Sequence, residues 1–520
     1  MEMKFLNRYA SVLLGVLTVF AVSACGDDQK PEVKPDVEIN IEVSSVELSF
    51  PADGGSLDIM VETDASGWDC MVAASWLEAE IFDDGIRVTA APNTQEEERN
   101  AEIVVFAFEG DVREEVQVAV SQDAMEDDAA GDEGDGDGDG EGEDGLVDGK
   151  IVFECPEFEY IIVSGYDADG DGAISLEEAA RIEDLVLTYD VENTEINKIT
   201  SLKGIEYFAN LVNLDCDLNA LTSLNLSGLK KLEYVDCSYN LIESIDVSGC
   251  ESLKWIYFYS NNVETIDLSG CPALMFIQGY KNKVRSLDVS GLAELVYFDM
   301  RFNELQEVKF SDCPKMNVAA LNDNNIASLE LKGLPELYTL GCYNNTLSSL
   351  DVSLLSNLEM LECYNNNLLS LDLTSNPKVT MLTCQNNMIS DLKISSCTKM
   401  KVLDCSSNRL SGDLDVTIFS GMQRLYCGGN SFDSVDVSEN TGLTELSCDN
   451  TNIIALELSK CAALESLICK DCLIETLDVS ANLELEKLHA QGNPLTSLVL
   501  SKGQQIKDLK VDDMGVITYK

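Results

Sequence analysis

The chain has 520 residues, with 34 Lys or Arg against 93 Asp or Glu, so its formal net charge is −59. A chain this acidic repels the phosphate backbone, which argues against nucleic acid as a partner. Hydrophobic residues make up 45% of the chain, so it can bury sizeable cores, and disorder along its whole length is excluded.

The first 24 residues have the features of a secretion signal. Lys4 and Arg8 supply positive charge, and an apolar run of signal-peptide length follows them. The run ends in Val22-Ser23-Ala24-Cys25, which resembles the lipobox of bacterial lipoproteins. The alternative is an ordinary signal peptide followed by an incidental cysteine.

The lipobox resemblance implies a lipid-anchored protein. Residues 1–24 would be removed, Cys25 would carry the acyl chains, and residues 25–37 would form a tether. The acidic Gly26-Asp27-Asp28 resembles the surface-export signal of gut Bacteroidota lipoproteins. We therefore expect a bacterial outer-membrane location with the chain exposed at the cell surface.

Residues 38–122 alternate apolar and polar side chains, as in Val46, Leu48 and Phe50, and turn residues separate the runs. This pattern predicts an antiparallel β-sandwich. The segment resembles a BACON domain of Bacteroidota surface proteins. The matching residues are Val46–Phe50, Gly54-Gly55, Gly67-Trp68, Ser75–Leu77, Asn93, Arg99, Ala101–Val105 and Val116–Gln122. The resemblance implies sugar binding or a spacer role, and Trp68 and Trp76 either stack on sugar or fill the core.

An acidic, glycine-rich segment follows at residues 123–149. Thirteen of these 27 residues are acidic, eight are glycine, and none is basic. Charge repulsion and glycine flexibility favour an extended linker.

Residues 150–198 contain one calcium-binding motif of the EF-hand type. Its oxygen ligands fall at the required spacing, and Gly172 permits the sharp turn at the sixth loop position. The predicted ligands are Asp167, Asp169, Asp171, the carbonyl of Ala173, Ser175 and a bidentate Glu178. A helix is expected before the loop, and another over residues 176–185. Because the loop is single, whereas EF-hand sensors carry pairs, we expect a structural Ca2+.

Residues 199–520 repeat with a period of 21. The unit Leu-x-x-Leu-x-Cys-x-x-Asn-x-Leu-x-x-Leu-x-Val-Ser begins fifteen times. The starts are 211, 232, 253, 274, 295, 316, 337, 358, 379 and 400, then, after one residue inserted near Gly412, 422, 443, 464, 485 and 506. This resembles a leucine-rich repeat solenoid, specifically the cysteine-ladder internalins. We expect one parallel β-sheet, no regular helices on the convex side, and residues 195–208 as an irregular cap.

Two residue types mark the interior of the repeat. Asn stands at the ninth unit position in twelve of the fifteen units, where its amide can bond to backbone groups across units. Cysteine alternates with apolar residues at the sixth and nineteenth positions, which predicts buried, reduced thiols that act as small hydrophobes. The overall prediction is a multidomain chain, with an N-terminal sandwich and a C-terminal solenoid.

The third, fifth and seventh residues of each unit should face solvent on the concave side of the sheet. Aromatic residues gather there in the second to fifth units, which suggests a surface for a protein or glycan ligand. The candidate ligand-binding residues are Tyr234, Trp255, Tyr257, Tyr259, Phe276, Tyr280 and Tyr297. The alternative is that some of these rings fold down to protect the sheet.

Acidic residues share this face. Asp215 and Asp236 should be neighbours, and such a pair could suggest a glycosidase, but a solvated acidic face is the preferred interpretation. The single histidine, His489, excludes a Cys2His2 zinc site. No catalytic motif is evident.

The sequence therefore predicts a non-catalytic adhesion or binding protein. Its ligand would be a glycoprotein, glycan or protein. The alternative is an accessory or hydrolytic component of a polysaccharide-utilisation system.

Overall fold

The computed structural model describes residues 41–43, 47–50, 55–63, 67–72, 77–82, 85–90, 93, 99–109, 112–122, 146–189 and 197–520. The chain forms two compact units, Met1–Gly138 and Asp139–Lys520. The predicted signal peptide, Cys25, the tether, Trp76 and residues 123–145 lie outside the described residues. Among the described residues, no helix has the length and apolar character needed to cross a membrane.

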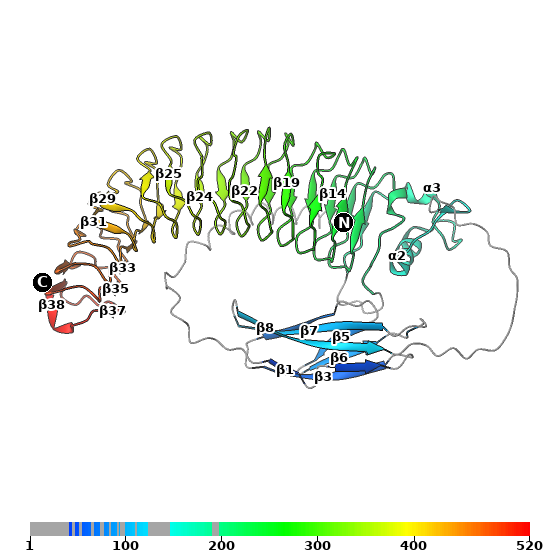
Figure 1. The fold of residues 1–520 in the computed structure, drawn as a ribbon, viewed down its shortest axis with the longest axis horizontal. Coiled ribbons are helices and arrows are strands. Elements are labelled where there is room, and N and C mark those ends of the chain that lie inside the picture. The colour runs from blue at the N-terminus through cyan, green and yellow to red at the C-terminus, as the bar shows by residue number, and fades with distance from the viewer. Residues whose placement is uncertain are drawn as a thin grey trace. The chain divides into compact units, whose positions relative to one another are not determined.

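The first unit contains two four-stranded sheets (Figure 1). The first has the strand order β1 (Ile41–Val43), β3 (Gly55–Thr63), β6 (Gly85–Ala90), β5 (Leu77–Phe82). The second has the order β2 (Glu47–Phe50), β8 (Val112–Gln122), β7 (Arg99–Glu109), β4 (Gly67–Val72).

Buried side chains from both sheets belong to one hydrophobic cluster, which includes Ile59, Ile86, Ile103 and Val118. Neighbouring strands pair antiparallel except β2 and β8, which pair parallel, so the prediction of a purely antiparallel arrangement is wrong at this edge. The side chain of Trp68 lies outside the described residues.

The second unit begins with a β-hairpin made of β9 (Leu146–Val147) and β10 (Lys150–Ile151). Helices α2 (Pro156–Tyr166) and α3 (Leu176–Ala179) follow, and then β11 (Asp184–Val186). The predicted helix over residues 176–185 is wrong, because only its first turn forms. Leu185 instead pairs with Leu214 as part of the long sheet and is 1% exposed.

One parallel sheet of 16 strands runs through the rest of the unit, with β11 as its first strand. The other fifteen are β12 (Asn213–Asp215), β14 (Tyr234–Asp236), β16 (Trp255–Tyr257), β18 (Phe276–Gln278), β20 (Tyr297–Asp299), β22 (Val318–Ala320), β23 (Thr339–Gly341), β24 (Met360–Glu362), β26 (Met381–Thr383), β28 (Val402–Asp404), β30 (Arg424–Tyr426), β32 (Glu445–Ser447), β33 (Ser466–Ile468), β35 (Lys487–His489) and β37 (Asp508–Lys510). Each corresponds to one predicted repeat. Figure 1 shows them following a curved row from β14 to β37, with α2 and α3 at its beginning.

Short strands return along the other side of most units. They are β13 (Ser223–Asn225), β15 (Ser244–Asp246), β17 (Thr265–Ile266), β19 (Ser286–Asp288), β21 (Glu307–Lys309), β25 (Ser370–Asp372), β27 (Asp391–Lys393), β29 (Ser411–Asp415), β31 (Ser431–Asp436), β34 (Thr476–Asp478), β36 (Ser497–Leu500) and β38 (Ile517–Tyr519). Two 3-10 turns, η1 (Ile205–Tyr207) and η2 (Met514–Val516), lie before the first and within the last predicted unit. As predicted, the repeats contain no α-helix over residues 211–520. In the pair β29–β31 the register shifts between Gly412 and Asp413, close to the inserted residue.

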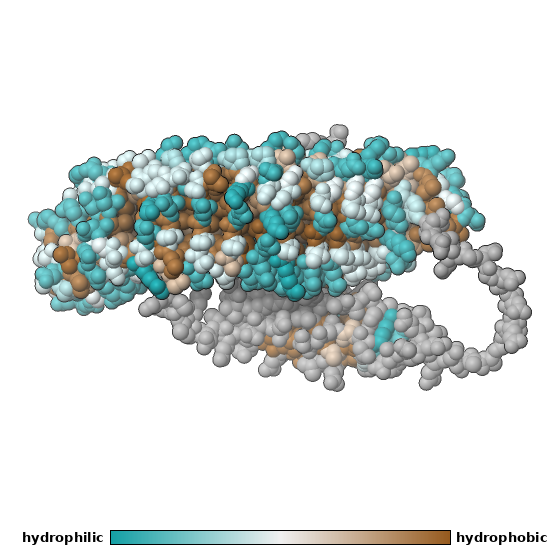
Figure 2. Space-filling model, turned by 45° about the horizontal axis from the view of Figure 1, so that its top comes forward, coloured by the Kyte–Doolittle hydropathy of each residue, from teal (hydrophilic) through white to brown (hydrophobic). Residues whose placement is uncertain are grey.

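A single hydrophobic cluster extends from Ile151 to Leu500, so the segment with the predicted calcium loop and the repeats share one core. Hydrophilic side chains cover most of the solenoid surface seen in Figure 2, apart from a narrow hydrophobic band along its length. The sixteen cysteines from Cys155 to Cys472 are all buried and free. The prediction of buried, reduced thiols is therefore confirmed for these residues.

The cysteines at the nineteenth unit position do more than fill space. The thiols of Cys250 and Cys313 donate to the carbonyls of Leu226 and Val289, at 3.2 and 3.1 Å. Asn376 occupies the same position in another unit, and its Nδ2 donates to Val352 O at 2.9 Å. A thiol or amide at this position can therefore donate a hydrogen bond as well as fill space, which the interpretation as small hydrophobes missed.

The predicted asparagine ladder is confirmed. In a typical unit, Asn240 Oδ1 accepts a bond from Leu221 N at 2.9 Å, and its Nδ2 donates to Cys216 O at 3.0 Å in the preceding unit. The same amide donates to Cys237 O of its own unit at 3.1 Å. Each asparagine thus joins two units through backbone groups that the sheet does not pair.

Gly279 shows how neighbouring units fit together. It holds the sixth position, and a Cβ there would lie 2.2 Å from Phe258 Cζ and 2.7 Å from Met300 Sδ, both in fully buried side chains. We expect Gly279→Cys, although it restores the repeat consensus, to lower the free energy of unfolding by about 1–3 kcal/mol through overpacking. Denaturant unfolding would measure this loss, and adding Phe258→Leu should recover part of it. A single variant as stable as the parent would contradict this packing.

Candidate functional site

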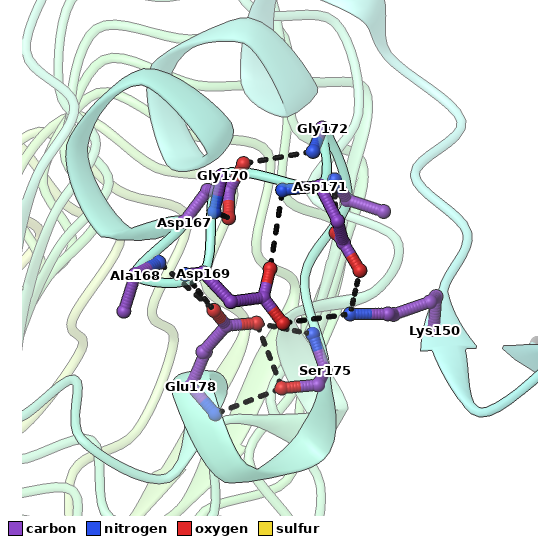
Figure 3. Close-up of polar contacts among 10 residues, drawn as sticks. Lys150, Asp167, Ala168, Asp169, Gly170, Asp171, Gly172, Ser175 and Glu178 are labelled. Carbon is purple, nitrogen blue, oxygen red and sulfur yellow. Dashed lines mark hydrogen bonds and ion pairs between the residues drawn. The ribbon is translucent and has the colours of Figure 1, made fainter.

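The predicted calcium loop connects α2 to α3 (Figure 3). Asp167, Asp169 and Asp171 each offer a carboxylate oxygen, and these oxygens lie within 4.8 Å of one another. The fold thus brings together the first three predicted ligands. Carboxylate oxygens at this spacing suit a hard cation such as Ca2+.

Backbone amides of the loop hold these carboxylates in place. Asp167 accepts bonds from Gly170 N and Gly172 N at 2.7 and 2.8 Å, and these bonds, chiefly the one from Gly172, lower its pKa. Asp169 Oδ1 accepts from Asp171 N at 3.1 Å. Gly172 has φ +84°, a conformation that favours glycine, so the sharp turn predicted at this position is present.

Glu178, the last predicted ligand, lies at the start of α3. Its carboxylate accepts bonds from Ala168 N at 2.8 Å, Ser175 N at 2.9 Å and Ser175 Oγ at 2.7 Å, and Ser175 caps the helix in return. The bonds from Ser175, followed by the one from Ala168, lower the pKa of Glu178 to about 2. Glu178 therefore lies at the loop as a charged carboxylate that accepts hydrogen bonds from loop groups. Carboxylate oxygens are ligands of the kind that a calcium site uses.

Strand β10 packs beside the loop. Ile151 N donates to Ile174 O at 2.8 Å, and the Ile174 side chain is fully buried. Lys150 of the same strand lies 2.6 Å from Asp171 Oδ2. The loop motif alone gave no signal of this lysine, because it comes from a separate hairpin.

The second candidate site is the outer sheet face, defined as the side chains at the third, fifth and seventh unit positions. Aromatic rings stack along its two margins. At the third position, Trp255 stacks on Phe276 with ring centroids 6.5 Å apart. At the seventh, Tyr259 and Tyr280 stack at 4.5 Å and 5°, and Tyr343 and Tyr364 at 4.2 Å and 9°.

The predicted ligand-binding rings differ in exposure. Tyr234, Tyr257 and Tyr297 are buried, so the expectation that they face solvent is wrong. They pack against neighbouring rings. Tyr234 lies 5.6 Å from Tyr257, and Tyr297 lies 6.1 Å from Phe276. Four predicted rings remain half-buried, namely Trp255, Tyr259, Phe276 and Tyr280.

The acidic residues of this face are mostly buried, contrary to the expected solvated surface. Asp215 and Asp236 are register partners, as predicted, and both are buried, as are Asp217, Asp299 and Glu362. Asp299 is paired with Arg301, whose Nε and Nη2 lie 2.8 and 2.7 Å from its oxygens. Burial raises the pKa of Glu362 to about 7. The face is therefore packed, with acids between two aromatic margins.

In the comparisons with known proteins, no protein-family model and no curated protein matches the chain. Among solved structures, it is similar to the functional domain of InlJ from Listeria monocytogenes, which includes a cysteine ladder. The identity is 27%, the TM-score is 0.53, and the match covers 67% of this chain and 71% of that one. The leucine-rich effector YopM of Yersinia pestis matches at 21% identity and TM-score 0.52, over 69% of this chain and 97% of that one. The internalin InlF of Listeria monocytogenes matches at 23% identity and TM-score 0.48, over 61% of this chain and 95% of that one. The second unit therefore has a leucine-rich repeat fold like that of InlJ.

Proposed function

We propose that this protein is a non-catalytic binding protein and that the outer sheet face binds a protein ligand. The observation that carries the proposal is the paired stacking of Tyr259 with Tyr280, two half-buried rings at 4.5 Å. Stacked rings offer a large contact area at low cost in side-chain entropy, and tyrosine is enriched among binding hot spots. The InlJ-like fold supports this proposal, because internalin-like folds commonly mediate protein binding or adhesion.

The remaining parts of the chain would serve this surface. We propose that acylated Cys25 anchors the protein in the outer membrane. The BACON-like first unit and the acidic linker would act as a spacer between the anchor and the solenoid. The two sheets with a common core are compatible with a β-sandwich of this kind.

The calcium loop would have a structural role. We propose that Asp167, Asp169, Asp171, Ser175, Glu178 and the carbonyl of Ala173 bind Ca2+. Because the loop leads within a few residues into β11, the first strand of the long sheet, a bound ion would stiffen the end of the solenoid.

Truncating the stacked pair tests the binding surface. We expect Tyr259→Ala/Tyr280→Ala to weaken ligand binding by about 30-fold, the effect of losing a hot spot worth about 2 kcal/mol. The control is Tyr160→Ala/Tyr519→Ala, which removes two tyrosines that are 60% and 58% exposed and lie off the outer sheet face. An array of host and microbial proteins and glycans, probed with the parent and both variants, gives the comparison.

The array also separates ligand classes. Protein hits that the stacked-pair variant loses and the control retains would support the proposal. Hits confined to glycans would reject a protein ligand, and protein hits that survive in the stacked-pair variant would reject this surface. Thermal melting of both variants checks that they remain folded.

A further inference from the structure

The hairpin β9–β10 places a lysine against the calcium loop. Its turn residues, Asp148 and Gly149, have φ of 51° and 79°. Strand β10 is then fixed to the loop by the antiparallel bridge of Lys150 with Ser175 and by the bond from Ile151 N to Ile174 O at 2.8 Å. The position of Lys150 is therefore set by backbone pairing.

The lysine reaches two carboxylates of the loop (Figure 3). Its Nζ lies 2.6 Å from Asp171 Oδ2 and 3.8 Å from Asp169 Oδ2. The Oδ1 atoms of these aspartates each accept a loop backbone N–H at 3.1 Å. Lys150 thus contacts the carboxylate oxygens that these backbone bonds leave available.

From this geometry we infer that Lys150 is a tethered cation that competes with Ca2+ for the loop and thereby sets its calcium affinity. This inference rests on the calcium site proposed above. Ca2+ would take its ligands from the same carboxylates, so the ion and the ammonium would compete for the oxygens of Asp169 and Asp171. The ammonium also repels a divalent ion in the same loop.

The same lysine has a second consequence. Without calcium, the loop gathers the negative charges of Asp167, Asp169 and Asp171, which repel one another. Lys150 compensates part of this charge. The end of the solenoid therefore stays folded over a wide range of calcium concentration, at the expense of calcium affinity.

Calorimetric titration of the purified chain with CaCl2 tests the inference. We expect Lys150→Met to bind calcium about tenfold more tightly than the parent, because one repelling charge is removed. Lys150→Arg keeps the charge and should stay near the parent. Lys332→Met is the control, since Lys332 pairs only with Glu330 among the described residues and its side chain is 72% exposed. In excess EDTA, Lys150→Met should melt below the parent, and in excess calcium it should not.

The outcomes are distinct. Tighter binding by Lys150→Met with no change for Lys332→Met supports the inference. Equal affinities for the parent and Lys150→Met overturn it while leaving the calcium site standing. No calcium binding by any variant overturns both the inference and the proposed calcium site.

Discussion

Replacing Asn324 with leucine is expected to lower the free energy of unfolding by about 3–5 kcal/mol. The Asn324 side chain is buried, and its Nδ2 donates to Met300 O, Leu321 O and Asn322 O at 2.9, 3.0 and 3.2 Å. Its Oδ1 accepts from Leu305 N at 2.9 Å. Leucine removes all four bonds. Leu305 N loses its acceptor in the interior, which costs about 1–3 kcal/mol, whereas Met300 O, Leu321 O and Asn322 O keep bonds from Asn303 Nδ2, Asn345 Nδ2 and Phe302 N. Each bond lost by these three carbonyls costs about a further 0.5–1.5 kcal/mol.

The neighbouring residue provides a matched control. Asn325 is exposed, so Asn325→Ala should change the free energy of unfolding by about 0.5 kcal/mol or less. Denaturant unfolding followed by circular dichroism measures both variants. Equal losses in the two variants would show that the ladder contributes no particular stability.

Removing calcium is the second change with a large expected effect. An ion that binds only the folded loop adds about 2.7 kcal/mol of stability when its free concentration is 100 times its Kd. We therefore expect excess EDTA to lower the melting temperature of the solenoid. Asp167→Ala should melt at this lower temperature whether or not calcium is present, because Asp167 is the proposed first ligand of the loop.

Glu484→Ala is the control for the loss of one negative charge. Glu484 is exposed on a turn of a late unit, and its variant should retain the full response to calcium. A parent protein whose melting temperature does not change on chelation would contradict a structural calcium ion.

The repeats explain why so much of the second unit could be predicted. An inward residue such as Leu214 recurs every 21 residues, so the pattern averages over fifteen units and local exceptions matter little. The asparagine ladder followed from the same repetition. A feature that occurs once had no such support. The helix after the loop was expected to continue to Leu185. The pairing of Leu185 with β12 and its burial in the core outweigh the helical sequence pattern there.

The contacts at the two sites were harder to predict. The loop motif locates Asp167, Asp169 and Asp171 but not Lys150. Lys150 belongs to the hairpin β9–β10, whose residues the sequence-based boundaries divide between the linker, which ends at residue 149, and the next segment. On the outer sheet face, the position of a residue within the repeat unit indicates whether its side chain points outward. Whether Tyr257 is exposed depends on how rings in adjacent units pack, and this is set by side-chain geometry that a single sequence does not reveal.

A hydrogen-exchange footprint of the first ligand captured by the purified chain would test the central claim most directly. The claim is that the outer sheet face is the binding surface. We expect slower exchange in the long-sheet strands β16, β18, β23 and β24 and in the residues directly after them, because the stacked aromatic rings lie there. Protection confined to the return strands such as β13 and β15, or to the first unit, would contradict the account.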